Sequence, residues 1–589
     1  MSRAATARVH TGRARPAPRQ MENIDVARIL EEIADLLEIQ GDNPFRIRAY
    51  RTAARTIETQ TTPVASLADE GRLDQLPGIG ADLADKIATI LRTGTLPLLH
   101  ELTAKTPEGV VQMLRIPGLG PKRTQQIYEA LKIASLDALE KAAMSGRLRE
   151  LPGIKQATER KILDGIASLR GQSGRWRLAD ADAYVQPLVA HLTACTAVQR
   201  LEVAGSYRRR KDTVGDVDIL TVSSKPRTVV KRFTEYPRVK QVQAEGATRS
   251  SVILDSGLQV DLRVVPAVSF GSALHYFTGS KSHNIAVRAL GLKRGLKINE
   301  YGVFRGTRRL SGRREEEVFE AVELPWIPPE LREARGEIEA AQSGHLPRLV
   351  ELADIRGDLQ VHTDATDGTS SLAEMVRAAR ERGYEYVAIT DHTKAVRVAG
   401  GLTRAEFHRQ FKAIDRLQSQ VSGIAILKGA EVDILDDGSL DLDAATLAEL
   451  DVVVVAVHSK FDLSRSAMTK RVVRALRHPR VQILGHPTGR LIVKREPYQI
   501  DLDQVMKAAA DYGVALEINA QPERLDLDDV QARAAHEAGV RLVVSTDAHR
   551  VEDLNVMRYG VDQARRGWCE ARHVLNTLAL PELRSALRR

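Results

Sequence analysis

The chain has 589 residues, a formal net charge of +9 and a hydrophobic fraction of 43%. A single domain usually takes roughly 100–200 residues, so this length predicts several domains, and the hydrophobic content is enough to give them buried cores. The two cysteines, Cys195 and Cys569, exclude a disulfide framework and a cysteine-based zinc site, and they suit the reducing cytoplasm. No run of about 18 apolar residues occurs, so we expect no membrane span.

The excess of positive charge lies in the N-terminal part of the chain. Residues 1–345 hold 52 Lys and Arg against 41 Asp and Glu, whereas residues 346–589 hold 34 against 36. Such an excess is typical of a surface that contacts phosphates, although many soluble domains are mildly basic. Residues 1–21 include five arginines and no acid. We interpret them as a disordered basic tail, with an organelle transit peptide as the alternative.

Residues 22–170 read as nearly all helix. Ile29, Ile33 and Leu36 recur at helical spacing, and a Gly-Asp-Asn-Pro break follows at residues 41–44. We predict one helical domain over residues 22–100 and a second, fingers-type domain over residues 101–175.

Three short segments of this helical part share an apolar, glycine-rich pattern and precede helices: residues 76–80, 116–120 and 151–155. Glycine lets the backbone turn sharply and present N–H groups to a phosphate at a helix N-terminus. This is the helix-hairpin-helix pattern. One copy would often be a plain turn, but three copies favour binding to the DNA backbone in both helical domains. The candidate DNA-binding residues are Gly78, Gly80, Gly118, Gly120 and Gly153.

Three carboxylates mark a candidate catalytic site where the pattern changes to short strands, over residues 200–265. Asp216 and Asp218 stand two apart at the start of a predicted strand, so they face the same way. Asp261 lies inside an apolar strand, where an unpaired acid is costly. Together they can bind two divalent cations that activate a 3′-hydroxyl and stabilise a leaving pyrophosphate. A solvated turn is the alternative for an isolated Asp-x-Asp pair.

The motif Gly-Ser-x-x-Arg…Gly-Asp-x-Asp within residues 205–218 resembles the signature of DNA polymerase β-like nucleotidyltransferases. The segments Tyr-Phe-Thr-Gly-Ser at 276–280 and Ile-Asn-Glu-Tyr-Gly at 298–302 narrow the resemblance to family X DNA polymerases. It implies an α+β palm over residues 176–265 and a nucleotide-selecting C-terminal polymerase subdomain over residues 266–322. A proline-rich stretch, residues 323–347, is predicted to be a linker.

The resemblance also implies roles for individual residues. Asp216, Asp218 and Asp261 would be catalytic and bind Mg²⁺ or Mn²⁺. The implied nucleotide-binding residues are Gly205, Ser206, Arg209, Tyr276, Phe277, Gly279, Asn284 and Arg288. Of these, Ser206 and Arg209 would hold the triphosphate, the aromatic pair and Gly279 would pack on the sugar, Asn284 would contact the base, and Arg288 the template. Gln259 and Lys281 depart from the animal relatives, which carry Arg and Asp there.

Residues 22–100 resemble the 8-kDa domain of DNA polymerase β, in which a lysine removes deoxyribose phosphate through a Schiff base. Lys86 matches that lysine. Asp82, one turn earlier, replaces a basic residue, and an acid there opposes the deprotonation that a nucleophilic lysine needs. The alternative is that Lys86 only binds a DNA phosphate.

After residue 347 the sequence alternates between strand-like and helical segments, which predicts a parallel sheet closed into a barrel. Histidines and acids follow nearly every predicted strand, and residues at the carboxyl ends of barrel strands converge on one mouth. A lone histidine is usually a core residue, but five with three acids predict a multinuclear metal site. The candidate ligands are Gln360, His362, Asp367, His392, Glu431, His458, His486, Asp547 and His549.

This part resembles the PHP phosphoesterase domain that is fused to many bacterial family X polymerases. The resemblance implies a distorted (β/α)7 barrel over residues 348–578 and up to three ions, Mn²⁺ or Zn²⁺. Gln360, His362, Glu431 and Asp547 would hold the first ion, Glu431, His458 and His486 the second, and Asp367, His392 and His549 the third. Gln360 stands where a histidine is usual, and an amide oxygen is the weaker ligand for such metals.

Together these features predict a cytoplasmic, monomeric repair enzyme that acts on gapped or nicked DNA. It would add dNTPs to fill short gaps, and its PHP domain would act as a 3′–5′ exonuclease, with apurinic endonuclease and 3′-phosphatase activities as further candidates. Two alternatives remain at this point: a DNA-binding scaffold with a degenerate catalytic domain, and a template-independent nucleotidyltransferase. The three aspartates argue against the first, and Asn284 and Arg288 against the second.

Overall fold

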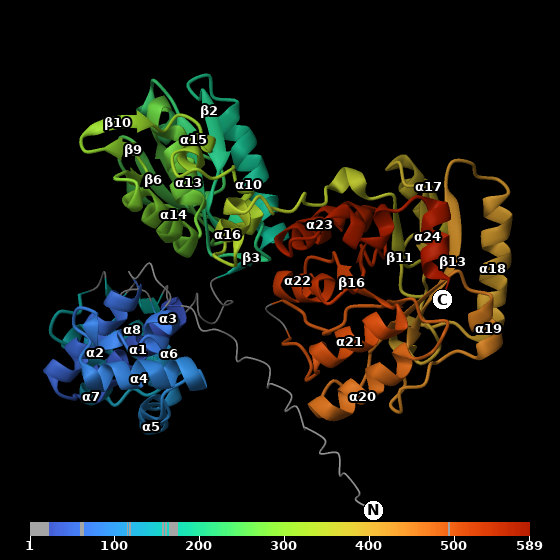
Figure 1. Ribbon diagram of the computed structural model, residues 1–589, viewed down its shortest axis with the longest axis horizontal. Helices are drawn as coiled ribbons and strands as arrows, with labels where there is room; N and C mark the ends of the chain where they lie inside the picture. Colours follow the sequence, from blue (N-terminus) through green and yellow to red (C-terminus); the bar gives the residue numbers. More distant parts are fainter. Residues whose placement is uncertain are drawn as a thin grey trace, which may run out of the picture. The chain divides into compact units, whose positions relative to one another are not determined.

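The computed structural model describes residues 23–58, 64–114, 116, 119–155, 158–159, 162–163, 175–492 and 495–588 (Figure 1). Gly118 and the predicted basic tail lie outside these residues. The chain divides into two compact units, residues 1–174 and 175–589. Within the described part, no helix combines the length and apolar character that a membrane span requires.

The first unit is helical, as predicted. Its α-helices are α1 (Asn23–Ile39), α2 (Pro44–Glu58), α3 (Val64–Asp69), α4 (Ala81–Thr93), α5 (Pro97–Lys105), α6 (Glu108–Met113), α7 (Pro121–Leu131) and α8 (Leu136–Met144). Residues at helical spacing along α1, such as Leu30, Ile33 and Leu37, are fully buried. Two separate hydrophobic clusters form the cores, one between Val26 and Leu102 and the other between Met113 and Ile162.

The second unit begins with a five-stranded sheet in the order β2-β4-β7-β6-β5. Its strands are β2 (Arg200–Val203), β4 (Asp216–Val222), β5 (Val239–Glu245), β6 (Arg249–Leu254) and β7 (Gln259–Val264). Helices α10 (Leu178–Thr193) and α12 (Pro226–Thr234) contribute the buried residues Val185, Leu188 and Phe233 to its core. The short helix α11 (Gly205–Arg208) joins β2 to the loop before β4. This mixed sheet is the predicted α+β palm architecture.

Helices α13 (Phe270–Thr278) and α14 (Lys281–Lys293) follow the palm, and a three-stranded sheet in the order β10-β9-β8 comes next. Its strands are β8 (Lys297–Asn299), β9 (Gly302–Arg305) and β10 (Arg308–Ser311), before α15 (Glu316–Glu320). The stretch expected to be a linker, residues 323–347, is folded: it contains η4 (Pro329–Leu331) and α16 (Glu337–Gln342). Ile327, Leu331 and Ile338 are buried in the same core as Val287 of α14.

The C-terminal part is the predicted barrel. Seven parallel strands pair in chain order: β11 (Gly357–Val361), β12 (Tyr386–Ile389), β13 (Ala425–Asp433), β14 (Val452–Ala456), β15 (Ile483–Leu484), β16 (Ala515–Asn519) and β17 (Leu542–Ser545). A parallel bridge between Val361 and Ala548 links the two ends of the sheet. The seven-stranded near-barrel fits the PHP fold.

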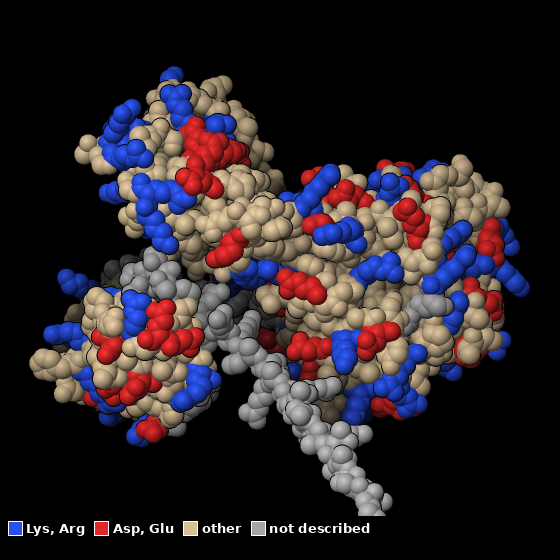
Figure 2. Space-filling view, viewed as in Figure 1, with Lys and Arg blue, Asp and Glu red and all other residues tan. Residues whose placement is uncertain are grey.

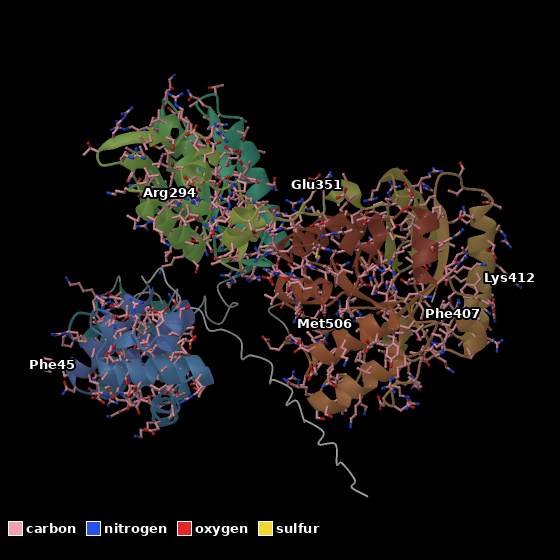
Figure 3. All side chains as sticks on the ribbon, viewed as in Figure 1. Phe45, Arg294, Glu351, Phe407, Lys412 and Met506 are labelled. Carbon is pink, nitrogen blue, oxygen red and sulfur yellow. The ribbon has the colours of Figure 1, made fainter. Side chains whose placement is uncertain are left out.

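Helices cover the outside of this barrel. They are α17 (Leu372–Glu381), α18 (Arg404–Gln418), α19 (Ala444–Ala448), α20 (Arg465–Leu476), α21 (Leu502–Tyr512), α22 (Asp529–Glu537), α23 (Met557–Arg566) and α24 (Leu580–Leu587). Ser371 and Thr403 begin α17 and α18 with capping boxes, which satisfy free N–H groups. Phe407 of α18 and Met506 of α21, labelled in Figure 3, are buried in the barrel core.

Candidate active sites

The three palm aspartates come from two adjacent strands. β4 and β7 run parallel, and Asp218 stands opposite Asp261 in the register. Burial raises the pKa of Asp218 to about 6, and repulsion from Asp216 adds to the effect. A buried carboxylate that stands beside other carboxylates is stabilised by a divalent cation, so this group fits the predicted metal site.

Glycine at position 205 allows the start of α11 to approach this group. Gly205 has a φ of +66°, and a Cβ there would lie 3.1 Å from Oδ2 of Asp218. A side chain would therefore meet both backbone strain and a clash. Ser206 is the next residue of α11.

Arg209 follows α11 and points to the end of α13. Its Nη1 donates to the carbonyl oxygen of Thr278 at 2.5 Å, and its Nε donates to Oε1 of Glu333 at 3.0 Å. Gly279 has a φ of +65°, and a Cβ there would lie 3.3 Å from the Arg209 Nη1. The glycine thus leaves room for the guanidinium.

The remaining nucleotide candidates stand on α13 and α14. The rings of Tyr276 and Phe277 meet edge to face, with centroids 5.1 Å apart. The side-chain amide of Asn284 donates to the carbonyl oxygen of Tyr276 at 2.7 Å. Arg288 is exposed one turn further along α14. The structure therefore brings the aromatic pair, Gly279 and Asn284 together, with Arg209 beside Gly279.

A buried ion network next to Arg209 was not predicted. Both oxygens of Glu315 accept hydrogen bonds from Arg208, at 2.6 and 2.9 Å, and Arg332 donates to the same carboxylate at 2.6 Å. Burial raises the pKa of Glu315, but Arg332 and Arg208 outweigh it and the net pKa is lowered. The run of three arginines at 208–210 was a usable signal, whereas no sequence pattern points to Glu315 or Arg332.

The described helix-hairpin-helix glycines fall into two groups. Gly80 and Gly120 are the N-cap residues of α4 and α7, with φ of −87° and −76°. Gly78 and Gly153 have φ of +78° and +80°, and a Cβ on Gly78 would lie 2.5 Å from Thr52. The first pair tolerates side chains, but the second pair is needed by the fold itself.

This difference gives a clean test of DNA binding. A Cβ on Gly80 or Gly120 has no neighbour within 4 Å, so Gly80→Val with Gly120→Val should leave the protein folded. The melting temperature should fall modestly, because valine is a poorer N-cap residue than glycine. The added side chains should keep the phosphate away from both helix N-termini and weaken binding roughly tenfold or more for all DNA sequences. Fluorescence anisotropy on two unrelated duplexes measures this. Unchanged affinity in the folded variant would mean that the turns are only structural.

Lys86 forms an ion pair with Asp82, with 2.5 Å between Nζ and Oδ2, and lies 5.5 Å from the Tyr50 ring centroid. Burial lowers the pKa of Lys86, but the hydrogen bonds to Asp82 and Tyr50 outweigh it, so the net pKa is raised. A raised pKa keeps the amine protonated and poorly nucleophilic at neutral pH. The geometry therefore suits phosphate binding better than Schiff-base chemistry.

Removing Asp82 should expose any latent lyase chemistry. We expect Asp82→Ala to lower the pKa of Lys86, and each unit of lowering gives about tenfold more free amine at a fixed pH below the pKa. Borohydride trapping on DNA with a 5′-deoxyribose phosphate should then give more adduct than the unsubstituted chain, with Lys86→Ala as the blank. Equal trapping by Asp82→Ala and the unsubstituted chain would show that Asp82 does not suppress the lyase reaction.

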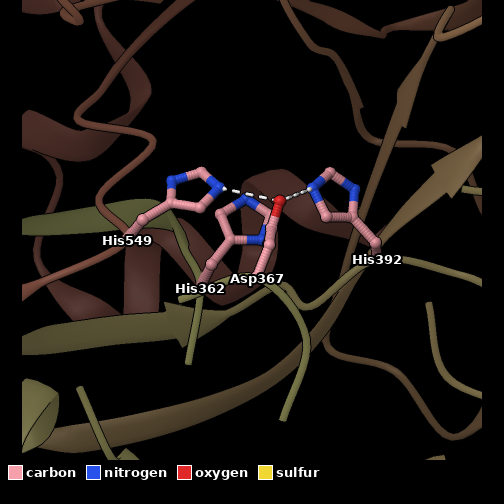
Figure 4. Close-up of side chains that lie close together, drawn as sticks. All are labelled: His362, Asp367, His392 and His549. Carbon is pink, nitrogen blue, oxygen red and sulfur yellow. Dashed lines mark ion pairs between the residues drawn. The ribbon is translucent and has the colours of Figure 1, made fainter. Parts of the chain in front are cut away.

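The barrel candidates converge at the carboxyl ends of the strands, as predicted. Three groups of side chains have ligand atoms close enough to share an ion: His362, Asp367, His392 and His549; His392, Glu431 and His458; and His362, Glu431 and Asp547. Figure 4 shows the first group, in which Asp367 lies between His392 and His549 at 3.4 Å from each.

Glu431 lies at the centre of these groups and is buried. Its carboxylate is 3.3 Å from Nε2 of His362 and 3.1 Å from Nε2 of His458. His486 is 3.0 Å from the same carboxylate, so it contacts the predicted bridging residue. Burial raises the pKa of Glu431, but His392 and His458 outweigh it and the net pKa is lowered. A central carboxylate that is charged at neutral pH suits the bridging role.

Several buried polar atoms of the barrel lack a hydrogen-bond partner within the described residues. They include both amide atoms of Gln360, Nδ1 of His362 and Nδ1 of His486. Buried polar groups normally have partners, and a bound metal ion accounts for such orphaned atoms. The donor set of imidazoles, carboxylates and one amide therefore fits the implied metal ions.

Two residues at the barrel site were not predicted. Asp433, two residues after Glu431, lies 3.1 Å from Nδ1 of His458 and so fixes the orientation of that ring. Glu517 of β16 is fully buried and accepts a hydrogen bond from the backbone N–H of His486 at 2.6 Å. The Glu-x-Asp spacing on β13 was a signal for Asp433, but nothing in the sequence marks Glu517.

Family models match four parts of the chain. A helix-hairpin-helix domain matches residues 21–96 and a SAM-like helix-hairpin-helix tandem matches residues 110–168. The DNA polymerase beta thumb matches residues 273–333, and the PHP domain matches residues 358–521. These matches confirm the resemblances drawn from the motifs.

Among curated relatives, DNA polymerase/3'-5' exonuclease PolX of Bacillus subtilis (strain 168) is 38% identical over 573 residues, 97% of this chain and 100% of that protein. A probable phosphatase of Thermoanaerobacter sp. (strain X514) is 30% identical over 37% of this chain and 89% of its own length. Another probable phosphatase, from Caldanaerobacter subterraneus subsp. tengcongensis, is 32% identical over 33% of this chain and 77% of its own length. The chain therefore belongs to the family X DNA polymerases that carry helix-hairpin-helix domains, a DNA polymerase beta thumb and a C-terminal PHP domain, the family of PolX.

Proposed function

We propose that this chain fills short gaps in DNA by templated nucleotide addition and trims 3′ ends with its PHP domain. The observation that carries the polymerase half is the group of three aspartates on β4 and β7, next to α11. Arg209 and the aromatic pair of α13 supply the partners that a triphosphate and a sugar require. The family relationship to DNA polymerase/3'-5' exonuclease PolX supports both halves.

In this mechanism Asp216, Asp218 and Asp261 would hold Mg²⁺ or Mn²⁺. Such an ion would lower the pKa of the 3′-hydroxyl and stabilise the negative charge of the leaving pyrophosphate. Ser206 and Arg209 bind the triphosphate, since a guanidinium forks onto phosphate oxygens. Tyr276, Phe277 and Gly279 pack on the sugar and reject a ribose. Asn284 contacts the base and Arg288 the template strand, and both contacts favour templated addition.

The DNA partner is supported by charge. Figure 2 shows Lys and Arg gathered over β9 and β10, where Arg305, Arg308 and Arg309 are exposed. The test is extension of a primer across a one-nucleotide gap, with each template base and each dNTP in turn. Addition that follows the template base supports the proposal. Addition indifferent to the template would indicate a terminal transferase, and none would indicate a scaffold.

The PHP domain is proposed to be a 3′–5′ exonuclease that binds up to three ions, Mn²⁺ or Zn²⁺. Gln360, His362, Glu431 and Asp547 would hold the first ion, Glu431, His458 and His486 the second, and Asp367, His392 and His549 the third. Release of labelled nucleotide from a 3′ end in Mn²⁺, compared with a chelator control, tests this. Duplexes with an abasic site or a 3′-phosphate test the apurinic endonuclease and phosphatase activities.

We further propose that the two helical domains span residues 22–100 and 101–175, the palm 176–265, the nucleotide-selecting subdomain 266–322 and the PHP domain 348–578. We also propose that the protein is a monomer. Gly78, Gly80, Gly118, Gly120 and Gly153 would mark the DNA-binding turns. A cytoplasmic location suits Cys195 and Cys569, which are free thiols.

A further inference from the structure

A buried cluster of charged side chains joins the palm, the segment after η4 and the PHP barrel within residues 175–588. Oε1 of Glu333 accepts hydrogen bonds from Nε of Arg209 and from Nη1 of Arg566, each at 3.0 Å. Arg566 is the last residue of α23, and its side chain is only 2% exposed. One carboxylate is therefore shared by a palm arginine and a PHP arginine.

Arg566 also makes contacts that hold it in place. Its Nη1 donates to the backbone carbonyl of Arg209 at 2.7 Å, and its Nη2 donates to Asp529 at 2.5 Å. Asp529 accepts a further bond from Arg335 at 3.0 Å. The cluster thus alternates guanidinium and carboxylate groups, the arrangement that buried charges require.

The cluster affects how Arg209 can bind phosphate. Burial raises the pKa of Glu333, but Arg566 and Arg209 outweigh it, so the net pKa is lowered and the carboxylate is charged at neutral pH. A charged Glu333 competes with an incoming triphosphate for the Arg209 guanidinium. If Arg209 were the only cation paired with Glu333, rotation of the Arg209 side chain toward a phosphate would leave Glu333 buried and unpaired. An unpaired buried charge is costly.

We propose that Arg566, a residue of the PHP domain, is a positioning residue for nucleotide binding in the polymerase domain. It keeps Glu333 paired when Arg209 turns to the triphosphate, and so lowers the energetic cost of nucleotide binding. This inference rests on the proposed role of Arg209 as a triphosphate ligand. It makes the barrel part of the polymerase mechanism, in addition to its own hydrolytic site.

The test measures KM and kcat for dNTP in gap filling. Arg566→Gln should raise KM about tenfold, within the usual range for coupled sites, with little change in kcat. Glu333→Gln removes the competitor and should lower KM. Adding Glu333→Gln to Arg566→Gln should bring KM down to the same lowered value, because Arg566 acts through Glu333. Such reversal is the sign of a direct interaction between the two side chains. A merely structural role for Arg566 predicts no rescue.

Arg565→Gln is the matched control. Arg565 precedes Arg566 on α23 and forms an ion pair with Glu330, outside the PHP barrel, at 2.8 Å. Within the described residues, no contact joins Arg565 to Glu333 or Arg209. Its KM should stay at the original value. Release of nucleotides from 3′ ends should be unchanged in Arg566→Gln, because Arg566 is not among the proposed metal ligands.

Arg209→Gln distinguishes a failure of the proposed role of Arg209 from a failure of the proposed role of Arg566. If it leaves KM unchanged, Arg209 is not a triphosphate ligand and that part of the proposed function fails. If it raises KM but Arg566→Gln does not, or Glu333→Gln gives no rescue, only the inference about Arg566 is overturned. Should Arg566→Gln fold poorly, Glu333→Gln alone decides, because a raised KM in that variant contradicts competition by Glu333.

Discussion

Replacing Asp261 by alanine should abolish gap filling while DNA binding stays nearly intact. The side chain stands opposite Asp218 on the neighbouring strand and completes the proposed cation site. Cations at such a site stabilise the transition state by several kcal/mol, so the rate should fall about a thousandfold or more. Affinity for DNA comes mainly from phosphate contacts elsewhere and should change little. Single-turnover extension of gapped DNA, paired with an anisotropy titration, measures both quantities.

Asp255→Ala serves as the control for this prediction. Asp255 lies in the turn between β6 and β7, on the same sheet, and its side chain is 51% exposed in an ion pair with Arg238. It should extend primers at the original rate. Extension by Asp261→Ala at more than a tenth of the control rate would mean that Asp261 does not hold a cation.

Local patterns account for the parts of the two sites that the sequence predicted. Asp216 and Asp218 share one face because side chains alternate along a strand. The barrel ligands share one mouth because parallel strands end at the same side of the sheet. Both inferences need only the residue type, the spacing and the element, so they hold without knowledge of tertiary contacts.

The features that were missed depend on contacts between distant segments. Glu315 meets Arg208 across 107 positions, and Arg209 meets Arg566 across 357. No periodicity links such residues. The segment 323–347 was expected to be a linker on account of its prolines. Pro329 instead begins a short helix, and Ile327, Leu331 and Ile338 are buried. Similarly, the sequence does not distinguish the roles of Gly78 and Gly80. The positive φ of Gly78 shows that the fold requires a glycine there, whereas Gly80 has a negative φ that other residues can adopt.

His362→Ala combined with Asp547→Ala should remove the nuclease and spare gap filling. The two side chains lie 3.1 Å apart, and together with Glu431 they form one of the candidate metal groups. Loss of a residue that only orients a ligand typically costs about 10–100-fold in metal affinity or activity, so loss of two direct ligands should cost more. Added Mn²⁺ should rescue the activity only in part. The assays are nucleotide release from a 3′ end and metal content of the purified protein.

The reverse variant, Asp216→Ala with Asp218→Ala, tests whether the hydrolytic site is separate. It should keep releasing nucleotides from 3′ ends, because no described palm residue belongs to the candidate metal groups of the barrel. Nuclease activity that persists in the His362→Ala, Asp547→Ala variant would mean that hydrolysis does not depend on this metal group of the barrel. A nuclease lost with the palm aspartates would place it in the palm. If each variant loses one activity, the two catalytic sites are separate, and an effect of Arg566 on gap filling does not pass through the hydrolytic site.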